Sequence, residues 1–102
     1  MNKQMTEVKF DEEGFLINHT DWTEELAKTI ADSEEIYDLS QRHFEVIYII
    51  RDEYTLNGEA PTLRRLTKVH GFPTKELYQL FPGGPGKKAA KIAGVKKPHG
   101  CI

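Results

Sequence analysis

The segment from residue 41 to residue 56 is the longest stretch in which apolar residues recur at helical spacing. Ser40 before it is a favourable N-cap, and Asn57-Gly58 after it is a favourable helix stop. The apolar residues form one broad face: Phe44, Ile47, Tyr48, Ile50 and Tyr54. Since a helix with so wide an apolar face needs cover from other elements, we predict this helix at the centre of the core.

Shorter elements surround this helix. Helices are predicted over 22–32 with Asp21 as N-cap, from Pro61 or Thr62 to Val69, over 75–81 after Thr74, and over 87–93 up to Gly94. An imperfect alternation with a turn at Glu13-Gly14 predicts an N-terminal β-hairpin, carried by Met5, Val8, Phe10, Phe15 and Ile17. Such a hairpin is marginal alone, so it must pack on the helices. The sequence therefore predicts an α+β fold whose last residues form an extended tail.

Composition limits the class of protein. With 102 residues, 38% of them hydrophobic, the chain is sized for one domain with one modest core. A single cysteine excludes an internal disulfide framework. The N-terminus has no apolar signal segment, and the longest apolar run, 46–50, is far too short to span a membrane. We expect a soluble, cytoplasmic monomer.

The charges divide the chain into two halves. Residues 1–58 hold 14 Asp and Glu against 5 Lys and Arg, whereas residues 59–102 hold 2 against 9. The two short helices at 62–69 and 75–81 resemble a helix-turn-helix, so one hypothesis is a nucleic-acid-binding regulatory protein. The second helix offers only Lys75, Glu76 and Gln79 as polar contacts, a poor set for reading base edges. Direct nucleic-acid binding is therefore kept as the alternative.

Two further patterns carry little chemistry. The stretch PGGPGKK lacks the spacing of a phosphate-binding P-loop and has no strand before it. His99 and Cys101 offer two possible metal ligands, whereas zinc sites need three or four, and His19, His43 and His70 are scattered along the chain. We expect no metal and no cofactor.

The thiol of Cys101, one residue from the end, is the strongest chemical signal. Lys96, Lys97 and His99 stand close enough in sequence to favour the thiolate, partly opposed by the terminal carboxylate. Eight residues follow Gly94; extended at roughly 3.3 Å per residue, they reach about 25 Å. A thiol on such an arm can enter a pocket of another protein. The pattern indicates a carrier rather than an enzyme with its own active site.

The C-terminal stretch LYQLFPGGPGKKAAKIAGVKKPHGCI resembles the C-terminus of the TusE/DsrC family of sulfur-relay proteins. Upstream, DEEGFL, the DW before the first helix, RHFEVIYIIRDEY and the AP before LRRLTK fit as well, so the resemblance covers nearly the whole chain. It implies a small N-terminal β-meander packed on about five helices, with residues 1–94 as one α+β domain. Residues 95–102 would be a mobile arm whose penultimate residue, Cys101, carries sulfane sulfur as a persulfide.

The same resemblance implies partners and one departure. A sulfurtransferase complex would donate the sulfur, and the acceptor would be a tRNA thiouridylase or an enzyme of sulfite reduction or sulfur oxidation. Members that serve sulfite reductase carry another cysteine eleven positions before the penultimate one. This chain has Ala90 at that position. In this respect the chain is closer to the TusE-type members, which relay sulfur toward wobble 2-thiouridine in tRNA. The pathway stays open between the two.

Overall fold

The computed structural model describes residues 8–98, and just over half of them are helical. A short 3-10 helix precedes five α-helices: η2 (His19–Asp21), α1 (Glu24–Ser33), α2 (Gln41–Asn57), α3 (Leu63–Lys68), α4 (Thr74–Leu80) and α5 (Pro85–Ile92). None of the described helices is both long and apolar enough to cross a membrane.

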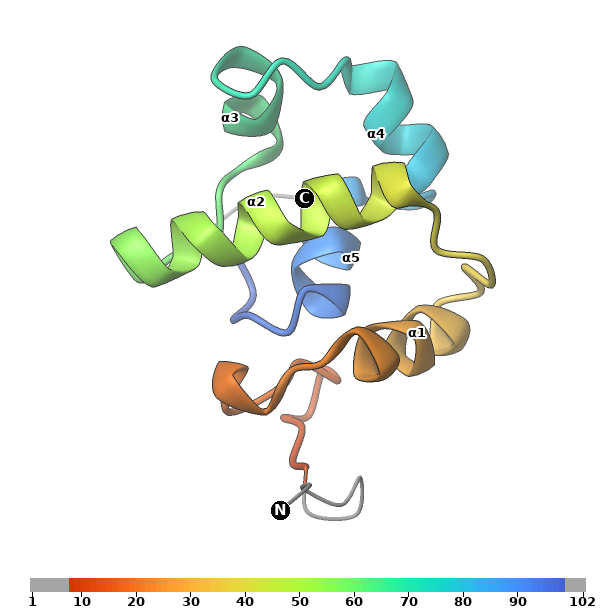
Figure 1. The fold of residues 1–102 in the computed structure, drawn as a ribbon, viewed down its shortest axis with the longest axis vertical. Helices are drawn as coiled ribbons and strands as arrows, with labels where there is room; N and C mark the ends of the chain where they lie inside the picture. The colour runs from red at the N-terminus through yellow and green to blue at the C-terminus, as the bar shows by residue number, and fades with distance from the viewer. Residues whose placement is uncertain (1–7, 99–102) are drawn as a thin grey trace.

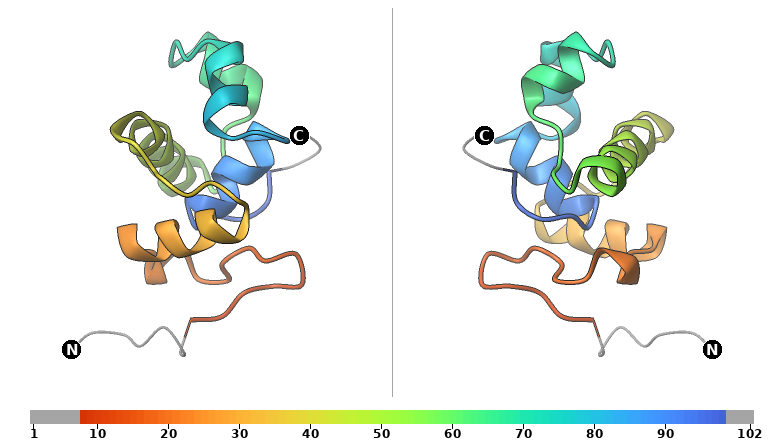
Figure 2. Two further views of the ribbon diagram at one scale, coloured as in Figure 1. Left: turned by 90° about the vertical axis from the view of Figure 1, so that its right-hand side faces the viewer. Right: turned by 90° about the vertical axis from the view of Figure 1, so that its left-hand side faces the viewer.

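Helix α5 lies at the centre of the array. It contacts α1, α2 and α4, and the views of Figures 1 and 2 show it enclosed between them. Its Ala89, Ala90 and Ile92 are at most 1% exposed. Two alanines in succession let the neighbouring helices approach closely, so a short helix near the end of the chain organises the core.

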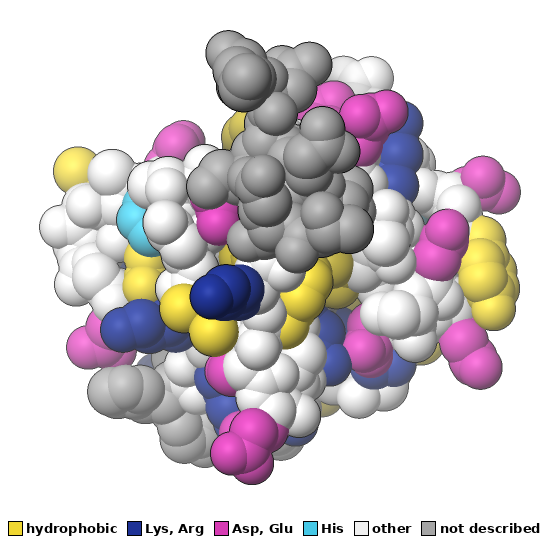
Figure 3. Space-filling model, turned by 90° about the horizontal axis from the view of Figure 1, so that it is seen from below, with side chains coloured by type: hydrophobic (Ala, Val, Ile, Leu, Met, Phe, Trp, Pro, Cys, Tyr) yellow, Lys and Arg dark blue, Asp and Glu magenta, His cyan; other side chains and the backbone are white. Residues whose placement is uncertain are grey.

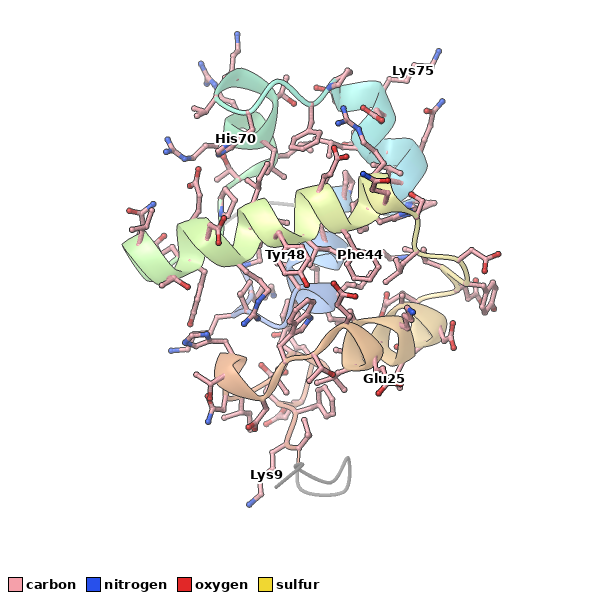
Figure 4. All side chains as sticks on the ribbon, viewed as in Figure 1. Lys9, Glu25, Phe44, Tyr48, His70 and Lys75 are labelled. Atoms are coloured by element: carbon pink, nitrogen blue, oxygen red, sulfur yellow. The ribbon has the colours of Figure 1, made fainter. Side chains whose placement is uncertain are left out.

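Helix α2 is one wall of this core rather than its centre. Its residues Val46, Ile47 and Ile50 are buried, but Tyr48 is 41% exposed. Figure 4 shows Tyr48 and Phe44 projecting from α2 toward α1. The apolar face that the sequence predicts is present, and one edge of it reaches the surface.

The helix starts follow local capping. The Ser40 hydroxyl accepts the His43 main-chain N–H, and the His43 ring accepts the Ser40 N–H in return, so α2 begins where the sequence predicts. For α1 the predicted N-cap, Asp21, is wrong. Asp21 ends η2, and Thr23 caps α1 by accepting the Leu26 N–H. Trp22 therefore stands between the two helices, not inside α1.

The predicted α+β fold with an N-terminal β-hairpin or β-meander is wrong. Among residues 8–98 the only strand-like pairing is an isolated antiparallel bridge between Phe10 and Leu16, and no sheet forms. The Asp11 carboxylate accepts the main-chain N–H groups of Glu13 and Phe15, which closes a compact turn. Met5, the first residue of the predicted hairpin, lies outside the described residues.

Burial explains why this segment is not a strand. Phe15 and Leu16 are adjacent and both at most 2% exposed, whereas Ile17 is 57% exposed and Phe10 41%. Successive side chains of a strand point to opposite faces, so two adjacent buried side chains break the period of two. The segment packs two consecutive anchors into the helices instead of extending a ladder.

Polar clamps attach the helix-turn-helix-like pair, α3 and α4, to α2. The Arg42 guanidinium donates through Nε and Nη2 to both carboxylate oxygens of Glu76 on α4, at 2.8 and 2.9 Å. Farther along α2, the Glu53 carboxylate accepts from Arg65 Nε at 2.6 Å and from His70 Nε2. The pair is thus held at both ends of the long helix.

The two charged halves of the chain pair with each other. Glu34 lies 2.9 Å from Lys91 Nζ and 3.8 Å from Lys88 Nζ, and Glu13 lies 3.0 Å from Lys97 Nζ and 3.8 Å from Lys87 Nζ. On the face seen in Figure 3, basic and acidic side chains are interspersed. Much of the charge asymmetry along the sequence is therefore complementarity within the fold.

Candidate functional site at the base of the C-terminal arm

The predicted site residues divide between described and undescribed parts of the chain. Cys101 and His99 lie outside the described residues. Lys96 and Lys97 are exposed just after α5, whereas Val95 is 1% exposed and Pro98 is buried. The first four residues of the arm, 95–98, thus combine two apolar anchors with two exposed cations.

The arm leaves α5 through a tight turn at Gly94. Gly94 has φ of +73°, and the Val95 N–H donates to the Ala90 carbonyl at 3.2 Å. A Cβ atom on Gly94 would lie 2.5 Å from Cδ1 and 2.9 Å from Cγ of Trp22. Only glycine satisfies both the left-handed backbone and the close approach of the indole.

Two distant side chains bind the last carbonyls of α5. Trp22 Nε1–H donates to the Ile92 carbonyl at 2.8 Å. Arg51 Nη1 donates to the Ala93 carbonyl at 2.9 Å, and the guanidinium stacks on the Trp22 ring, 4.3 Å from its centroid. Since the final carbonyls of a helix lack intrahelical partners, these contacts both satisfy them and fix the end of α5.

Trp22 and Arg51 stand in two of the family motifs quoted above, DW and RHFEVIYIIRDEY, but no role at the site was predicted for either. A signal was present for Arg51, because it stands seven residues after Phe44 and so shares the apolar face of α2. A cation on such a face needs a partner inside the fold. For Trp22 the signals were its place in the DW motif and next to the predicted N-cap, and neither indicates a contact with residue 92 or 94.

One of the two described lysines of the arm is held by an ion pair. Lys97 Nζ bonds Glu13 Oε1 at 3.0 Å, and both side chains are about half exposed, at 48% and 50%. Such an exposed pair contributes little stability, roughly 0–1 kcal/mol. It nevertheless places Lys97 toward the N-terminal turn, while Lys96 is exposed beside it.

A second candidate site lies beside Glu53. A surface hollow of about 430 Å³ is lined by Glu53, Asn57, Glu59, Ala60, Pro61, Thr62 and Arg65. Burial alone would raise the pKa of Glu53, but hydrogen bonds from His70 and Arg65 outweigh it, and the pKa is lowered. The Glu53 carboxylate is already bonded by Arg65 and His70. The residues that line the hollow include no cysteine. Within residues 8–98 no three His, Cys, Asp or Glu side chains gather as a metal site.

Comparison with known proteins identifies the family. A family model described as "DsrC like protein" matches residues 2–102. This chain belongs to the DsrC-like family. The resemblance of its C-terminal block to the TusE/DsrC proteins is thereby confirmed.

Curated relatives of this DsrC-like chain carry two kinds of name. The gamma subunit of dissimilatory-type sulfite reductase from Nitratidesulfovibrio vulgaris is 48% identical over 92 residues, covering 90% of this chain and 88% of that protein. The sulfurtransferase TusE of Escherichia coli K12 is 42% identical over 103 residues, covering 94% of each. A TusE homologue from Haemophilus influenzae is 37% identical over 109 residues, covering 100% of this chain and 99% of that protein. Similarity thus extends over most of the length of both groups, from 88% to 99% of each relative.

Solved structures share the fold. The crystal structure of dissimilatory sulfite reductase I has a chain that matches with a TM-score of 0.83 at 46% identity, covering 93% of this chain and 91% of that one. DsrC of Allochromatium vinosum matches with a TM-score of 0.77 at 36% identity, covering 91% and 88%. The helical array described above is therefore the arrangement of the DsrC-like family.

Proposed function

We propose that this DsrC-like chain carries sulfane sulfur as a persulfide on Cys101 and relays it to an acceptor protein. The observation that carries the proposal is the cysteine count. A persulfide carrier needs a thiol, and this sequence holds a single one, Cys101. The chain is also similar, over 94% of its length, to a protein named as a sulfurtransferase. The thiol follows a stretch, 95–98, that the fold anchors beside the end of α5.

The transfer is an exchange of sulfur between thiols with no net oxidation. The Cys101 thiolate attacks the outer sulfur of a donor persulfide, the donor S–S bond breaks, and the donor thiolate leaves. Cys101 then holds the outer sulfur. Attack on that sulfur by an acceptor thiolate restores the Cys101 thiolate. The rate depends on the thiolate fraction, which Lys96 and His99 would raise, and on access.

The buried residues of the arm limit how far Cys101 can travel. Val95 and Pro98 are buried, so only three steps of chain separate Pro98 from Cys101, about 10 Å at roughly 3.3 Å per residue. Releasing Val95 and Pro98 would restore the full reach of about 25 Å from Gly94. If Val95 and Pro98 stay buried, the acceptor must approach the base of the arm. If the arm extends fully, binding of the acceptor must displace these two apolar anchors.

Donor and acceptor belong to one of two pathways. The relatives include a sulfite reductase subunit and a sulfurtransferase, so a sulfurtransferase donor and either a sulfite-reducing or a tRNA-thiolating acceptor fit the chain. Ala90, where two-cysteine members have a second cysteine, is 1% exposed within α5. A single-thiol carrier that hands its sulfur onward needs no second thiol, which favours the TusE-type role.

A nucleic-acid-binding function is not what the molecule favours. Of the polar residues predicted for base contact, Glu76 on α4 is engaged by Arg42, and Tyr78 is 45% exposed in that stretch. Figure 4 shows Lys75 projecting away from the body. The exposed side chains of α4 include Lys75, Tyr78 and Gln79, and one cation with two neutral groups is a weak surface for reading bases.

Mass spectrometry tests the proposal. After incubation with a persulfide-bearing cysteine desulfurase, the wild-type protein should gain one sulfur atom, located by peptide mapping on Cys101 and removed by dithiothreitol. The Cys101→Ser variant is the matched control, since it changes one atom in the undescribed end of the chain. Equal sulfur on wild type and Cys101→Ser would disprove the proposal.

A further inference from the structure

The Arg51 side chain occupies an unusual place for a cation. It starts from the apolar face of α2 and reaches the end of α5, where Nη1 donates to the Ala93 carbonyl at 2.9 Å. Nη2 donates to the His19 carbonyl at 3.2 Å. Both of these hydrogen bonds go to main-chain carbonyls. A guanidinium at the C-terminus of a helix is also attracted by the negative end of the helix dipole.

Trp22 completes the contact. Its ring lies under the Arg51 guanidinium at 4.3 Å, its Nε1–H bonds the Ile92 carbonyl, and its Cδ1, Cγ and Cβ atoms leave no room for a side chain on Gly94. The indole is therefore a wall along which the chain must turn as it leaves α5. Arg51 holds that wall in place by stacking on the ring.

We propose that Arg51 is a positioning residue for sulfur transfer: with Trp22 it fixes the point and direction in which the chain leaves α5 at Gly94. The inference rests on the sulfur-carrier function proposed above. Cys101 stands seven residues after Gly94, at most about 23 Å of extended chain at roughly 3.3 Å per residue, so an error in direction at Gly94 moves the thiol by several ångströms or more. Misplacement of a reacting atom by about 1 Å can cost on the order of 100-fold in rate.

The same helix supplies a matched control. Arg42 also starts from α2 and also stacks on an aromatic ring, that of Phe72, at 4.6 Å. Its hydrogen bonds go to the carboxylates of Glu76 and Glu45, and it joins α2 to α4 rather than to the arm. Arg51→Met and Arg42→Met thus remove the same chemistry from one helix at two places, only one of which is the base of the arm.

The first test places the arm without reference to sulfur. A nitroxide attached to Cys101, the only cysteine, broadens the amide signals of residues near the end of the arm. In wild type the broadened amides should form one confined set around the end of α5. Arg51→Met should spread the broadening over other faces of the domain, and Arg42→Met should leave the set unchanged. The same map for wild type and Arg51→Met would overturn the inference.

The second test measures transfer. With a desulfurase persulfide as donor, kcat/KM for sulfur transfer should fall about tenfold or more in Arg51→Met and stay within about twofold in Arg42→Met. Alkylation of Cys101 by iodoacetamide should stay within about twofold in both, since the thiol itself is untouched. Arg51→Lys, which keeps the charge but not the fork of donors, should recover part of the transfer rate. Equal losses in the two methionine variants would contradict a positioning role.

A third variant covers the case in which Arg51→Met does not fold. Trp22→Phe keeps an aromatic ring for stacking but removes the Nε1–H bond to Ile92 and part of the bulk of the indole. As in Arg51→Met, the nitroxide on Cys101 should then broaden amide signals on other faces of the domain. An unchanged set of broadened amides would refute the inference. If wild-type Cys101 takes up no sulfur, the proposed function fails, whereas the nitroxide maps still decide where the arm is held.

Discussion

Replacement of Gly94 by alanine probes the contact on which the direction of the arm depends. Gly94 has φ of +73°, and a Cβ atom there would lie 2.5, 2.9 and 3.0 Å from Cδ1, Cγ and Cβ of Trp22. These distances are too short for carbon atoms, so the indole must move. Moving it stretches the Trp22–Ile92 hydrogen bond and the stack with Arg51.

The expected cost follows from three contributions. A left-handed backbone costs an alanine about 1–2 kcal/mol. Overpacking against a fixed ring costs about 1–3 kcal/mol, and loss of the indole hydrogen bond costs about 1 kcal/mol. Gly94→Ala should therefore lower the free energy of unfolding by about 3–6 kcal/mol, against a total of about 5–15 kcal/mol for a domain of this size.

Gly58→Ala is the matched control. Gly58 has φ of +77°, close to that of Gly94, but nothing lies within 4 Å of the added Cβ. This variant should show the backbone cost alone, about 1–2 kcal/mol. The difference between the two variants, about 2–4 kcal/mol, then isolates the clash with Trp22 and its consequences.

Urea unfolding measures both variants. Fluorescence reports on Trp22, the only tryptophan, and far-ultraviolet circular dichroism reports on the helices. The fluorescence of folded Gly94→Ala should also differ from wild type, while that of Gly58→Ala should not. If the two variants differ by less than about 1 kcal/mol, the indole is not the wall described here.

Two further predictions concern a buried carboxylate and the lone thiol. Because the pKa of Glu53 is lowered from its ordinary 4.5, the unfolded chain binds more protons just below that pH, and the unfolding free energy falls as the pH drops through this range. Glu53→Gln should lower the free energy of unfolding by about 1–2 kcal/mol at pH 7. In urea titrations from pH 6 to pH 3, this free energy should also fall less steeply in the variant than in wild type. An unchanged pH dependence would argue against the contacts of Glu53 with Arg65 and His70. Mild oxidation should give a reducible dimer through Cys101 on a non-reducing gel and no faster-migrating monomer, since the chain holds no second cysteine. A dimer that persists in Cys101→Ser would contradict this.

The sequence determined most of the helical array because its signals are local. Ser40, Thr62 and Gly58 act on their immediate neighbours, so α2 and α3 begin and α2 ends close to where capping rules predict. The N-terminal hairpin failed for the opposite reason. Whether Phe15 and Leu16 point to opposite faces or both enter the core depends on the helices that receive them, which a local pattern does not record.

The chemistry of the arm divides in the same way. The sequence alone determined that the chain has one thiol and that this thiol stands near the C-terminus. It also determined that the C-terminal block of the chain resembles a sulfur-relay family. Only the tertiary structure decided how the arm begins: Trp22 and Arg51 reach the α5 carbonyls from 70 and 42 residues away in sequence. It also decided that Lys88 and Lys91 are bound by Glu34. Contacts between residues so distant depend on how helices pack, and packing depends on shape and burial throughout the chain, which no single segment contains.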